Sequence, residues 1–408
     1  MSNEASTSLD MARMAALARF YRKHLLEDVM PFWEKRTADT ECGGYLTCFD
    51  RQGNVTDEEK YIWFQGRQLW MFAALYNRVE QRSDWLELAR IGRDFIVAHA
   101  YAGDGRWNYQ VDRQGGFRRG TISIATDYFV LSGLSEYAVA TGSDEDFAMI
   151  RETYRAIEQA VHDPGFKDIF HSTWSPRFKR HGIHMMGVHV AGLAGQVLGD
   201  ERTRPFIDHC LMQVLSVFAH DDRQMLLESV APDGSFVDDD EGRVLNPGHA
   251  LESMWFCMEE GRKRRDHAII DRAVQIANWT YLLGHDTECG GIFSFLDANG
   301  KQPTQTDWHK QTQVSWDDKV WWVHSEALYA LALAAVGTDS RVFWDRFVAL
   351  HEWCQDHFYD AEYGEWYPEL YRDGRPKKTD KGTLWKAAYH LPRALMYLAV
   401  LFEKVSAS

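Results

Sequence analysis

A glycine-turn motif recurs along the whole chain and constrains its fold more than any other feature. Glu41-Cys42-Gly43-Gly44 returns as Glu288-Cys289-Gly290-Gly291, and an aspartate and then a glycine follow each copy. Looser copies lie at 105–115 and 363–374, and fainter ones around Phe170 and Gly234. Each copy predicts a short β-hairpin. Copies spaced by roughly 60 to 75 residues indicate about six repeats, and so long a period is typical of an array of helix pairs.

The segments between these turns are of two kinds. One kind is amphipathic, as in 88–96 and 270–277, where apolar residues recur at helical spacing. The other kind is apolar on nearly all sides and ends at a glycine, as in 128–142, 185–199, 249–261 and 327–337. A helix that is apolar all round is buried, and a glycine is the usual helix stop. We therefore predict an all-α fold, an (α/α)6 barrel with short hairpins in its loops. No linker interrupts the pattern, so residues 1–408 are expected to form a single domain.

The amino-acid composition argues against several classes of partner and location. The formal net charge is −15, and no basic patch stands out, which argues against nucleic acid and anionic membranes as partners. The six cysteines contain no CxxC pair, and the first twenty residues lack an apolar signal core. No run of residues is long enough to span a bilayer. We expect a cytoplasmic protein.

Polar residues gather where the apolar helices are predicted to begin. If these helices run parallel, their starts share one end of the barrel and line one pocket. Tryptophans lie close by, and aromatic faces beside hydrogen-bonding groups suit a sugar ring. Trp322 and Trp385 are the tryptophans expected to touch substrate, whereas Trp70 and Trp255 are expected in the core. The polar residues at the predicted helix starts are Arg67, Asp127, His184, His249 with Glu252, His324 with Glu326, and His390.

Two of these histidines stand beside a proline. In Asn246-Pro247-Gly248-His249, the asparagine is a good helix cap and proline is favoured as the first helical residue. In the second stretch we expect Pro392 to begin the helix, with His390 just outside it. The positive end of a helix disfavours a charged imidazole, so both side chains are expected to be neutral near pH 7. Two such bases suit a reaction that removes a proton from one face of a carbon and returns it to the other.

These motifs, taken together, resemble the N-acylglucosamine 2-epimerase family over nearly the whole chain. The resemblance implies an (α/α)6 barrel that interconverts sugars through their open-chain aldehydes. It also implies that His249 and His390 are the acid/base pair, that Arg67 contacts substrate near the carbonyl end, and that the protein is a homodimer. The segments that carry the resemblance are 60–68, 246–252, 321–327 and 389–393, with the turns at Gly44, Gly291 and 363–366.

The resemblance leaves the substrate open. Members that act on cellobiose, and the related aldose–ketose isomerases, carry a further histidine where this chain has Met186, and cellobiose epimerases tend to have glutamine in place of His324. Both differences favour interconversion of N-acyl-D-glucosamine and N-acyl-D-mannosamine. The alternative is a 2-epimerase or aldose–ketose isomerase acting on unmodified mannose, glucose, fructose or cellobiose, because His184 is placed to reach the same space.

The chemistry assigns a role to each candidate. Glu252 or His324 would help to open the sugar ring, one histidine would remove the C2 proton, and Arg67 would stabilise the enediolate. Trp322, Trp385, Asp127 and His184 complete the expected substrate contacts, and Glu326 is interpreted as a structural partner. No metal or redox cofactor is needed, and His181, His184 and His189 do not share a helix face as zinc ligands would. Some members of the family need ATP as an activator, but the chain has no GxxxxGK[ST] loop, so any nucleotide site is unknown.

Two other classes of function compete with an epimerase. A glycoside hydrolase would need two carboxylates across the scissile bond, for which Asp127, Glu228, Glu252 and Glu326 are candidates. A non-catalytic binding protein would keep its role after His249 or His390 is replaced. Both fit less well, because neither has a use for a pair of histidine bases on opposed faces.

Overall fold

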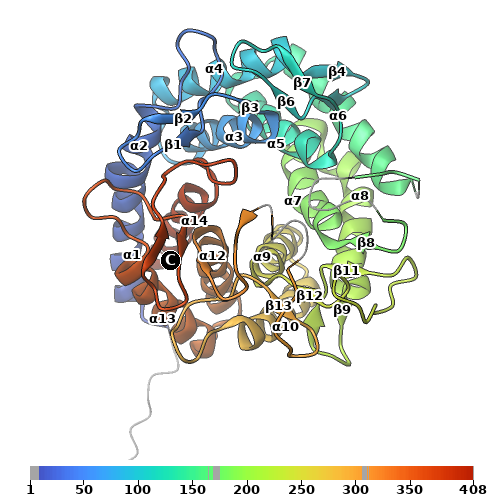
Figure 1. The fold of residues 1–408 in the computed structure, drawn as a ribbon, viewed down its shortest axis with the longest axis vertical. Helices are drawn as coiled ribbons and strands as arrows, with labels where there is room; N and C mark the ends of the chain where they lie inside the picture. The colour runs from blue at the N-terminus through green and yellow to red at the C-terminus, as the bar shows by residue number, and fades with distance from the viewer. Residues whose placement is uncertain (1–8, 164, 169–174, 306–309, 311, 408) are drawn as a thin grey trace, which may run out of the picture.

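The computed structural model describes residues 9–163, 165–168, 175–305, 310 and 312–407. Its helices form two concentric rings, seen along the ring axis in Figure 1. The inner helices are α3 (Ile62–Arg78), α5 (Ile124–Thr141), α7 (His181–Leu198), α9 (Pro247–Arg264), α12 (Trp321–Thr338) and α14 (His390–Ser406). The outer helices are α1 (Met11–Lys23), α2 (Met30–Glu34), α4 (Ser83–His99), α6 (Asp144–His162), α8 (Asp200–Met212), α10 (His267–Gly284) and α13 (Arg341–His357). Two π-helical segments extend α1 and α8, namely η1 (His24–Val29) and η2 (Gln213–Val217).

Contacts between the inner helices close the ring. Each inner helix contacts the next one along the chain, and the last, α14, contacts the first, α3. The outer helix α1 packs against α14 as well, so the two ends of the chain meet. This arrangement confirms the predicted (α/α)6 barrel. None of the described helices combines the length and apolar character that a membrane span requires.

The inner helices are buried on every side, as their composition predicts. In α5 every residue from Ile124 to Ala138 is buried. Two glycines let α3 and α5 approach closely, since a Cβ on Gly66 would lie 2.5 Å from the Phe129 carbonyl carbon. The predicted glycine stops are confirmed for α5 and α7, which Gly142 and Gly199 cap.

The glycine stops are wrong for two other inner helices. Helix α9 continues past Gly261 to Arg264, and α12 continues past Gly337 to Thr338. Gly261 serves packing instead, because a Cβ there would come within 2.8 Å of the Ile270 side chain on α10. Each of these two helices ends at a residue in the left-handed conformation, Arg265 or Asp339.

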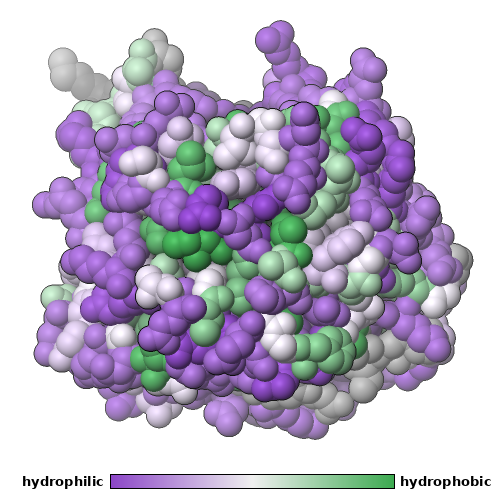
Figure 2. All heavy atoms as spheres, turned by 90° about the horizontal axis from the view of Figure 1, so that it is seen from above, coloured by the Kyte–Doolittle hydropathy of each residue, from purple (hydrophilic) through white to green (hydrophobic). Residues whose placement is uncertain are grey.

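The outer helices present a mostly polar surface to solvent. Figure 2 views the ring from its edge and shows hydrophilic residues over most of this face, with hydrophobic residues in small separate areas. The amphipathic pattern of these helices explains this surface, because their apolar stripe packs against the inner ring. In α4, for example, Trp85, Ala89, Phe95 and Ile96 are buried.

Short strands join the loops at one end of the barrel. The pairs within a loop are β1 (Cys48–Phe49) with β2 (Val55–Asp57), β4 (Tyr101–Gly103) with β5 (Arg106–Trp107), β6 (Gln110–Val111) with β7 (Phe117–Arg119), β9 (Ala219–His220) with β10 (Met225–Leu226), and β15 (Glu369–Leu370) with β16 (Pro376–Lys378). The pairs between loops are β3 (Lys60–Tyr61) with β6, β8 (Lys179–Arg180) with β11 (Ser229–Val230), β12 (Val244–Leu245) with β13 (Leu296–Asp297), and β14 (Lys319–Val320) with β15. All these pairs are antiparallel. The hairpin expected around Phe170 lies outside the described residues.

The pairs between loops fix where the inner helices begin. Strands β3, β8, β12 and β14 directly precede α3, α7, α9 and α12, and each pairs with a strand from a later loop. The sequence predicted hairpins within single loops and missed this pairing between neighbours. Its consequence is that the starts of the inner helices are held by the loop of the following repeat.

Buried ion clusters strengthen three of these junctions. In each cluster the aspartate that begins a glycine turn pairs with a fully buried lysine and with an arginine from the next loop around the ring. Burial alone would raise the pKa of each aspartate, but its cationic partners hold that pKa well below its usual range. The clusters are Asp39 with Lys60 and Arg113, Asp286 with Lys319 and Arg372, and Asp360 with Lys381 and Arg51. The third cluster joins the last repeat to the first.

Candidate active site

A cavity of about 190 Å³ lies at the N-terminal ends of the inner helices. Its wall takes residues from the first turns of α3, α5, α7, α9, α12 and α14. The expectation that these helix starts share one pocket is therefore correct. The predicted site residues that line the cavity are Arg67, His249, Glu252, Trp322, Trp385 and His390.

His249 lies in the first turn of α9, as predicted. Pro247 is the first helical residue, and the Asn246 side chain accepts a hydrogen bond from the His249 backbone N–H at 3.1 Å. The Nδ1 atom of His249 is 3.1 and 3.0 Å from the two carboxylate oxygens of Glu228, in the loop before β11. Glu228 also contacts His181 Nδ1 at 3.2 Å.

The Glu228 carboxylate opposes the predicted neutral state of His249. Burial alone would lower the pKa of this imidazole, but the Glu228 carboxylate outweighs burial and raises that pKa above its ordinary value. The pKa of Glu228 is held well below its usual range, because the two histidines outweigh the effect of burial there too. A carboxylate in the loop before α9 therefore acts against the positive end of the helix.

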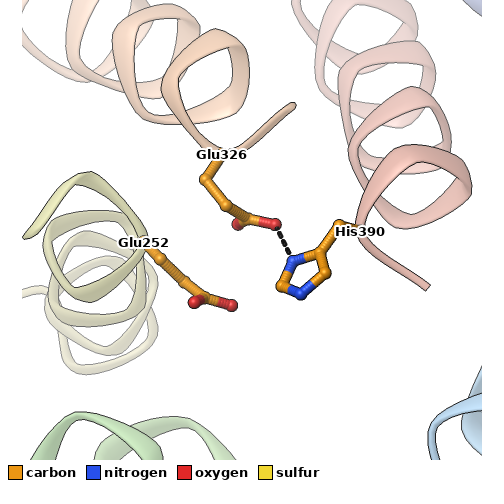
Figure 3. Close-up of side chains that lie close together, drawn as sticks. All are labelled: Glu252, Glu326 and His390. Carbon is orange, nitrogen blue, oxygen red and sulfur yellow. Dashed lines mark hydrogen bonds and ion pairs between the residues drawn. The ribbon is translucent and has the colours of Figure 1, made fainter. Parts of the chain in front are cut away.

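His390 is the first residue of α14, not a residue outside it. Pro392 is the third helical residue, and proline fits there because the first N–H groups of a helix have no partner within the helix. Nδ1 of His390 donates to Oε1 of Glu326 at 2.7 Å, as Figure 3 shows. Burial, with a smaller effect from Arg67, lowers the pKa of His390 well below its usual range. The prediction of a neutral imidazole is confirmed for this residue.

One indole connects the two histidines. The ring centroid of Trp322 lies 5.2 Å from that of His249 and 5.6 Å from that of His390. All three side chains line the same cavity. Two imidazoles from different inner helices therefore face one space, beside an aromatic surface of the kind that suits a sugar ring.

Arg393 lies behind this group and joins two carboxylates. Its Nη2 atom donates to Oε1 of Glu252 at 2.5 Å and to Oε1 of Glu326 at 2.7 Å. Together with His390, these two glutamates have potential ligand atoms within 4.8 Å of one another (Figure 3). This donor set does not fit a metal ion well, because the guanidinium already contacts both carboxylates.

Arg67 brings a second guanidinium to the cavity. Its charged group lies over the rings of Phe129, Trp63 and Tyr389, at 4.0, 4.6 and 4.8 Å from their centroids. Its Nε atom has no hydrogen-bond partner among the described residues. Burial lowers the pKa of Arg67 to about 10, so the group still carries its charge at neutral pH. It is placed to donate to an oxygen in the cavity.

His324 is not in the cavity, contrary to its predicted role in substrate binding and ring opening. Its Nδ1 contacts the Val320 carbonyl oxygen at 2.8 Å, and its Nε2 accepts from the Ile292 N–H at 2.9 Å. Burial lowers the pKa of His324 to about 3, in keeping with a neutral ring. The side chain anchors the glycine turn of the fifth repeat.

Asp127 and His184 are also directed away from the cavity wall. Asp127 accepts from Arg106 Nε at 2.6 Å and from the Trp107 N–H at 2.9 Å, so it fixes the strand β5. The ring of His184 packs against His209 and Phe218, with centroids 5.6 and 5.7 Å away. The structure does not support the predicted substrate contacts of either residue.

The sequence interpretation missed three functional candidates. Glu228 was considered only as a hydrolase carboxylate, and nothing in the sequence links it to His249, 21 residues further along the chain. Arg393 lies three residues after His390, a helical spacing that signals its position behind the histidine. Glu369, on β15, lines the cavity, and its Oε2 has no hydrogen-bond partner among the described residues.

Comparison with known proteins agrees with this geometry. Residues 44–394 match the family model described as N-acylglucosamine 2-epimerase. The chain belongs to the N-acylglucosamine 2-epimerase family. It is 32% identical over 387 residues to the N-acylglucosamine 2-epimerase of Bos taurus, covering 91% of this chain and 87% of that protein.

More distant members of the family are similar too. The cellobiose 2-epimerase of Dictyoglomus turgidum is 23% identical over 403 residues, covering 90% of this chain and 94% of that protein. A crystal structure of D-mannose isomerase superposes with a TM-score of 0.81 at 19% identity, covering 97% and 99% of the two chains. The protein is accordingly an isomerase of the carbohydrate 2-epimerase family.

Proposed function

We propose that the protein interconverts N-acyl-D-glucosamine and N-acyl-D-mannosamine by two-base proton transfer at C2 of the open-chain sugar. One observation carries the proposal: His249 and His390 line one cavity, and both contact Trp322. An inversion at carbon needs a proton acceptor on one face and a donor on the other. The carboxylate of Glu228 at Nδ1 favours His249 as the donor, and the lowered pKa of His390 favours this ring as the acceptor.

The proposed steps balance as follows. With C1 as an aldehyde, Nε2 of one histidine takes the C2 proton, and the electron pair of the C–H bond becomes a C1–C2 double bond. The π pair of the carbonyl moves to the C1 oxygen, which gives an enolate that carries the N-acyl group on C2. Arg67 donates to the oxygen that gains charge, because its guanidinium lies in the cavity wall with Nε unpartnered. The other histidine then gives its proton to the opposite face of C2, and the C1 aldehyde re-forms.

Glu252 is the proposed group for opening the ring. It lines the cavity, and one of its oxygens accepts from Arg393. Glu228 is occupied by two histidines, and His324 is outside the cavity. We further propose that these proton transfers need no metal or redox cofactor, since Arg67 in the cavity wall supplies the positive charge that the enolate requires.

The cavity wall supports an N-acylated substrate. On the α7 side it is formed by Gly182, Ile183, Met185 and Met186, and such an apolar wall suits an acyl methyl group. Trp322 and Trp385 offer faces for the sugar, and Glu369 offers a carboxylate oxygen to a hydroxyl. The similarity to cellobiose 2-epimerases and to D-mannose isomerase favours the second candidate, an epimerase or aldose–ketose isomerase of unmodified sugars.

Proton NMR in deuterium oxide tests the proposal directly. The purified protein is offered N-acetylglucosamine, mannose, glucose and cellobiose in turn. We expect the 2-epimer of N-acetylglucosamine to appear with deuterium at C2. Faster conversion of an unmodified sugar would favour the second candidate, and release of new reducing ends from cellobiose would indicate a hydrolase.

Three expectations from the sequence remain proposals. A homodimer is tested by light scattering coupled to size-exclusion chromatography. A cytoplasmic location is tested by fractionation of the cells that make the protein. Activation by ATP is tested by comparing initial rates with and without the nucleotide, and the site of binding stays unassigned.

A further inference from the structure

The two cavity histidines each contact a glutamate, but the glutamates differ in their other partners. Glu326 accepts from His390 and from Arg393 on Oε1, at 2.7 Å in each case, and from Trp255 Nε1 on Oε2 at 2.7 Å. Its negative charge is therefore offset by a fully buried guanidinium, which Glu252 shares. This leaves little net charge to stabilise a second proton on His390.

Glu228 has no such counter-charge. Both of its oxygens face Nδ1 of His249, and its further contact is His181. Arg180 lines the same cavity but donates to Ser229 at 2.7 Å and to Glu241 at 2.7 Å. Among the described residues, no guanidinium contacts Glu228. Its charge acts on the histidines alone.

We propose that Arg393 is a positioning residue that decides which histidine carries the proton in the resting enzyme. It neutralises Glu326 and so leaves His390 as the base, while Glu228 keeps the proton on His249. The inference rests on the proposed function in one respect, namely that these two histidines exchange protons with substrate.

The charges around the two rings balance in this state. Glu228, Glu252 and Glu326 supply three negative charges, and Arg67, Arg393 and a protonated His249 supply three positive ones. A second proton on His390 would leave the group positive. The charged groups that face His390 are Glu326 on α12, Glu252 and His249 on α9, Arg393 on α14 and Arg67 on α3. Among the described residues, those that face His249 include Glu228 before β11, Glu252 on α9, Arg67 on α3 and His390 on α14.

Each direction of turnover starts from a different protonation form. The resting form takes a proton from the C2 face that His390 contacts and donates from His249, and the reverse conversion starts from the form with the proton on His390. After one turnover the proton is on His390, and His249 is neutral. The enzyme regains its resting state by exchange with solvent, which makes this return a separate step of the cycle.

The test is a titration of the full chain, without substrate, labelled with ¹⁵N in its histidine rings. Of the 17 histidines, the two of interest are assigned with His249→Asn and His390→Asn. In the wild type we expect His249 to titrate at higher pH than His390. Arg393→Met should raise the midpoint of the His390 titration by about 1–3 pH units, because a cation 3.5 Å from Nδ1 is lost. Arg393→Lys, which keeps the charge, should restore most of the difference.

Two further variants make the test specific. Arg78→Met removes a half-buried guanidinium that pairs with Glu136 outside the cavity wall, and it should leave both titrations unchanged. Glu228→Gln should lower the midpoint of His249, and it tests the same claim if Arg393→Met does not fold. A folded Arg393→Met with the wild-type His390 titration would overturn the proposal, as would a wild type in which His390 titrates above His249. Failure of the proposed function would appear separately, as a wild type with the expected titrations but no epimerisation.

Discussion

The starts of the inner helices carry histidines in two different environments. His249 and His390 face the cavity and share contact with Trp322, whereas His324 and His184 face outward to the hairpins and outer helices. The sequence gives all four similar positions at a helix start. The comparison shows that the direction in which a side chain points around the helix axis decides whether it reaches the cavity or packs against the surrounding structure. Its distance from the helix start matters less.

Helix α12 shows how this separation arises. Trp322 lines the cavity, and Glu326, four residues on, holds His390. Residues four apart lie on nearly the same face, whereas His324 is about 200° from each at about 100° per residue. It therefore points to the glycine turn and stacks on Trp353 of α13. In α7, His184 lies two residues from both Gly182 and Met186, which line the cavity, and it is turned away for the same reason.

The largest expected effect comes from removing either cavity histidine. His390→Asn and His249→Asn should each lower the epimerisation rate about 10²- to 10⁴-fold, the usual value of general acid–base catalysis. Initial rates by NMR, with circular dichroism to verify folding, measure this effect. If either variant kept the wild-type rate, the distinction between the two kinds of histidine would fail.

Loss of Arg67 should have the next largest effect. Arg67→Met should lower kcat about 10²- to 10³-fold, because it removes one donor to the enolate oxygen. Steady-state kinetics on the substrate that the NMR experiment identifies measure the change. Arg106→Met is a suitable control, since Arg106 pairs with Asp127 on the outward side. An equal loss of kcat in both variants would show that Arg67 has no special place in the reaction.

Substitutions of side chains that face away from the cavity should change the free energy of unfolding. Lys319→Met should lower the free energy of unfolding by about 3–5 kcal/mol, since it leaves Asp286 buried with only part of its counter-charge. The retained contact of Arg372 to Asp286 favours the lower end of that range. Urea denaturation measures this effect. Lys301→Met, at an exposed position outside these clusters, should cost far less.

The smallest expected effect, that of replacing His324, distinguishes the two kinds of histidine most clearly. His324→Leu should cost about 1–3 kcal/mol of stability, because the buried Ile292 N–H loses its acceptor. Its kcat should stay within a few-fold of the wild type when assayed well below the unfolding temperature. Thermal unfolding and steady-state kinetics on one preparation measure both quantities. A rate as low as that of His249→Asn would place His324 in the reaction after all.

The fold was predictable because the same local sequence pattern recurs along the chain. The recurring glycine turns and the alternation of apolar and amphipathic segments indicate helix pairs without knowledge of any long-range contact. Helix ends were less predictable: Gly261 and Gly337 look like stops but lie inside α9 and α12. A glycine ends a helix only where packing does not require a small residue within it.

The site was predictable in its residues but not in its electrostatics. His249, His390, Glu252 and Arg67 stand in recognisable local motifs, and they line the cavity. The charge state of His249 depends instead on Glu228, 21 residues away in the chain. No helical or strand periodicity predicts such a contact, and the expected effect of the helix end is opposed by one half-buried carboxylate.

Exchange of the C2 proton in the two histidine variants tests the central claim most directly. Each epimer is incubated in deuterium oxide with His249→Asn or with His390→Asn, and label at C2 is followed by NMR. The account predicts that each variant exchanges the C2 proton of one epimer without converting it, and that the two variants select opposite epimers. Exchange of the same epimer by both variants, or wild-type conversion without label at C2, would contradict it.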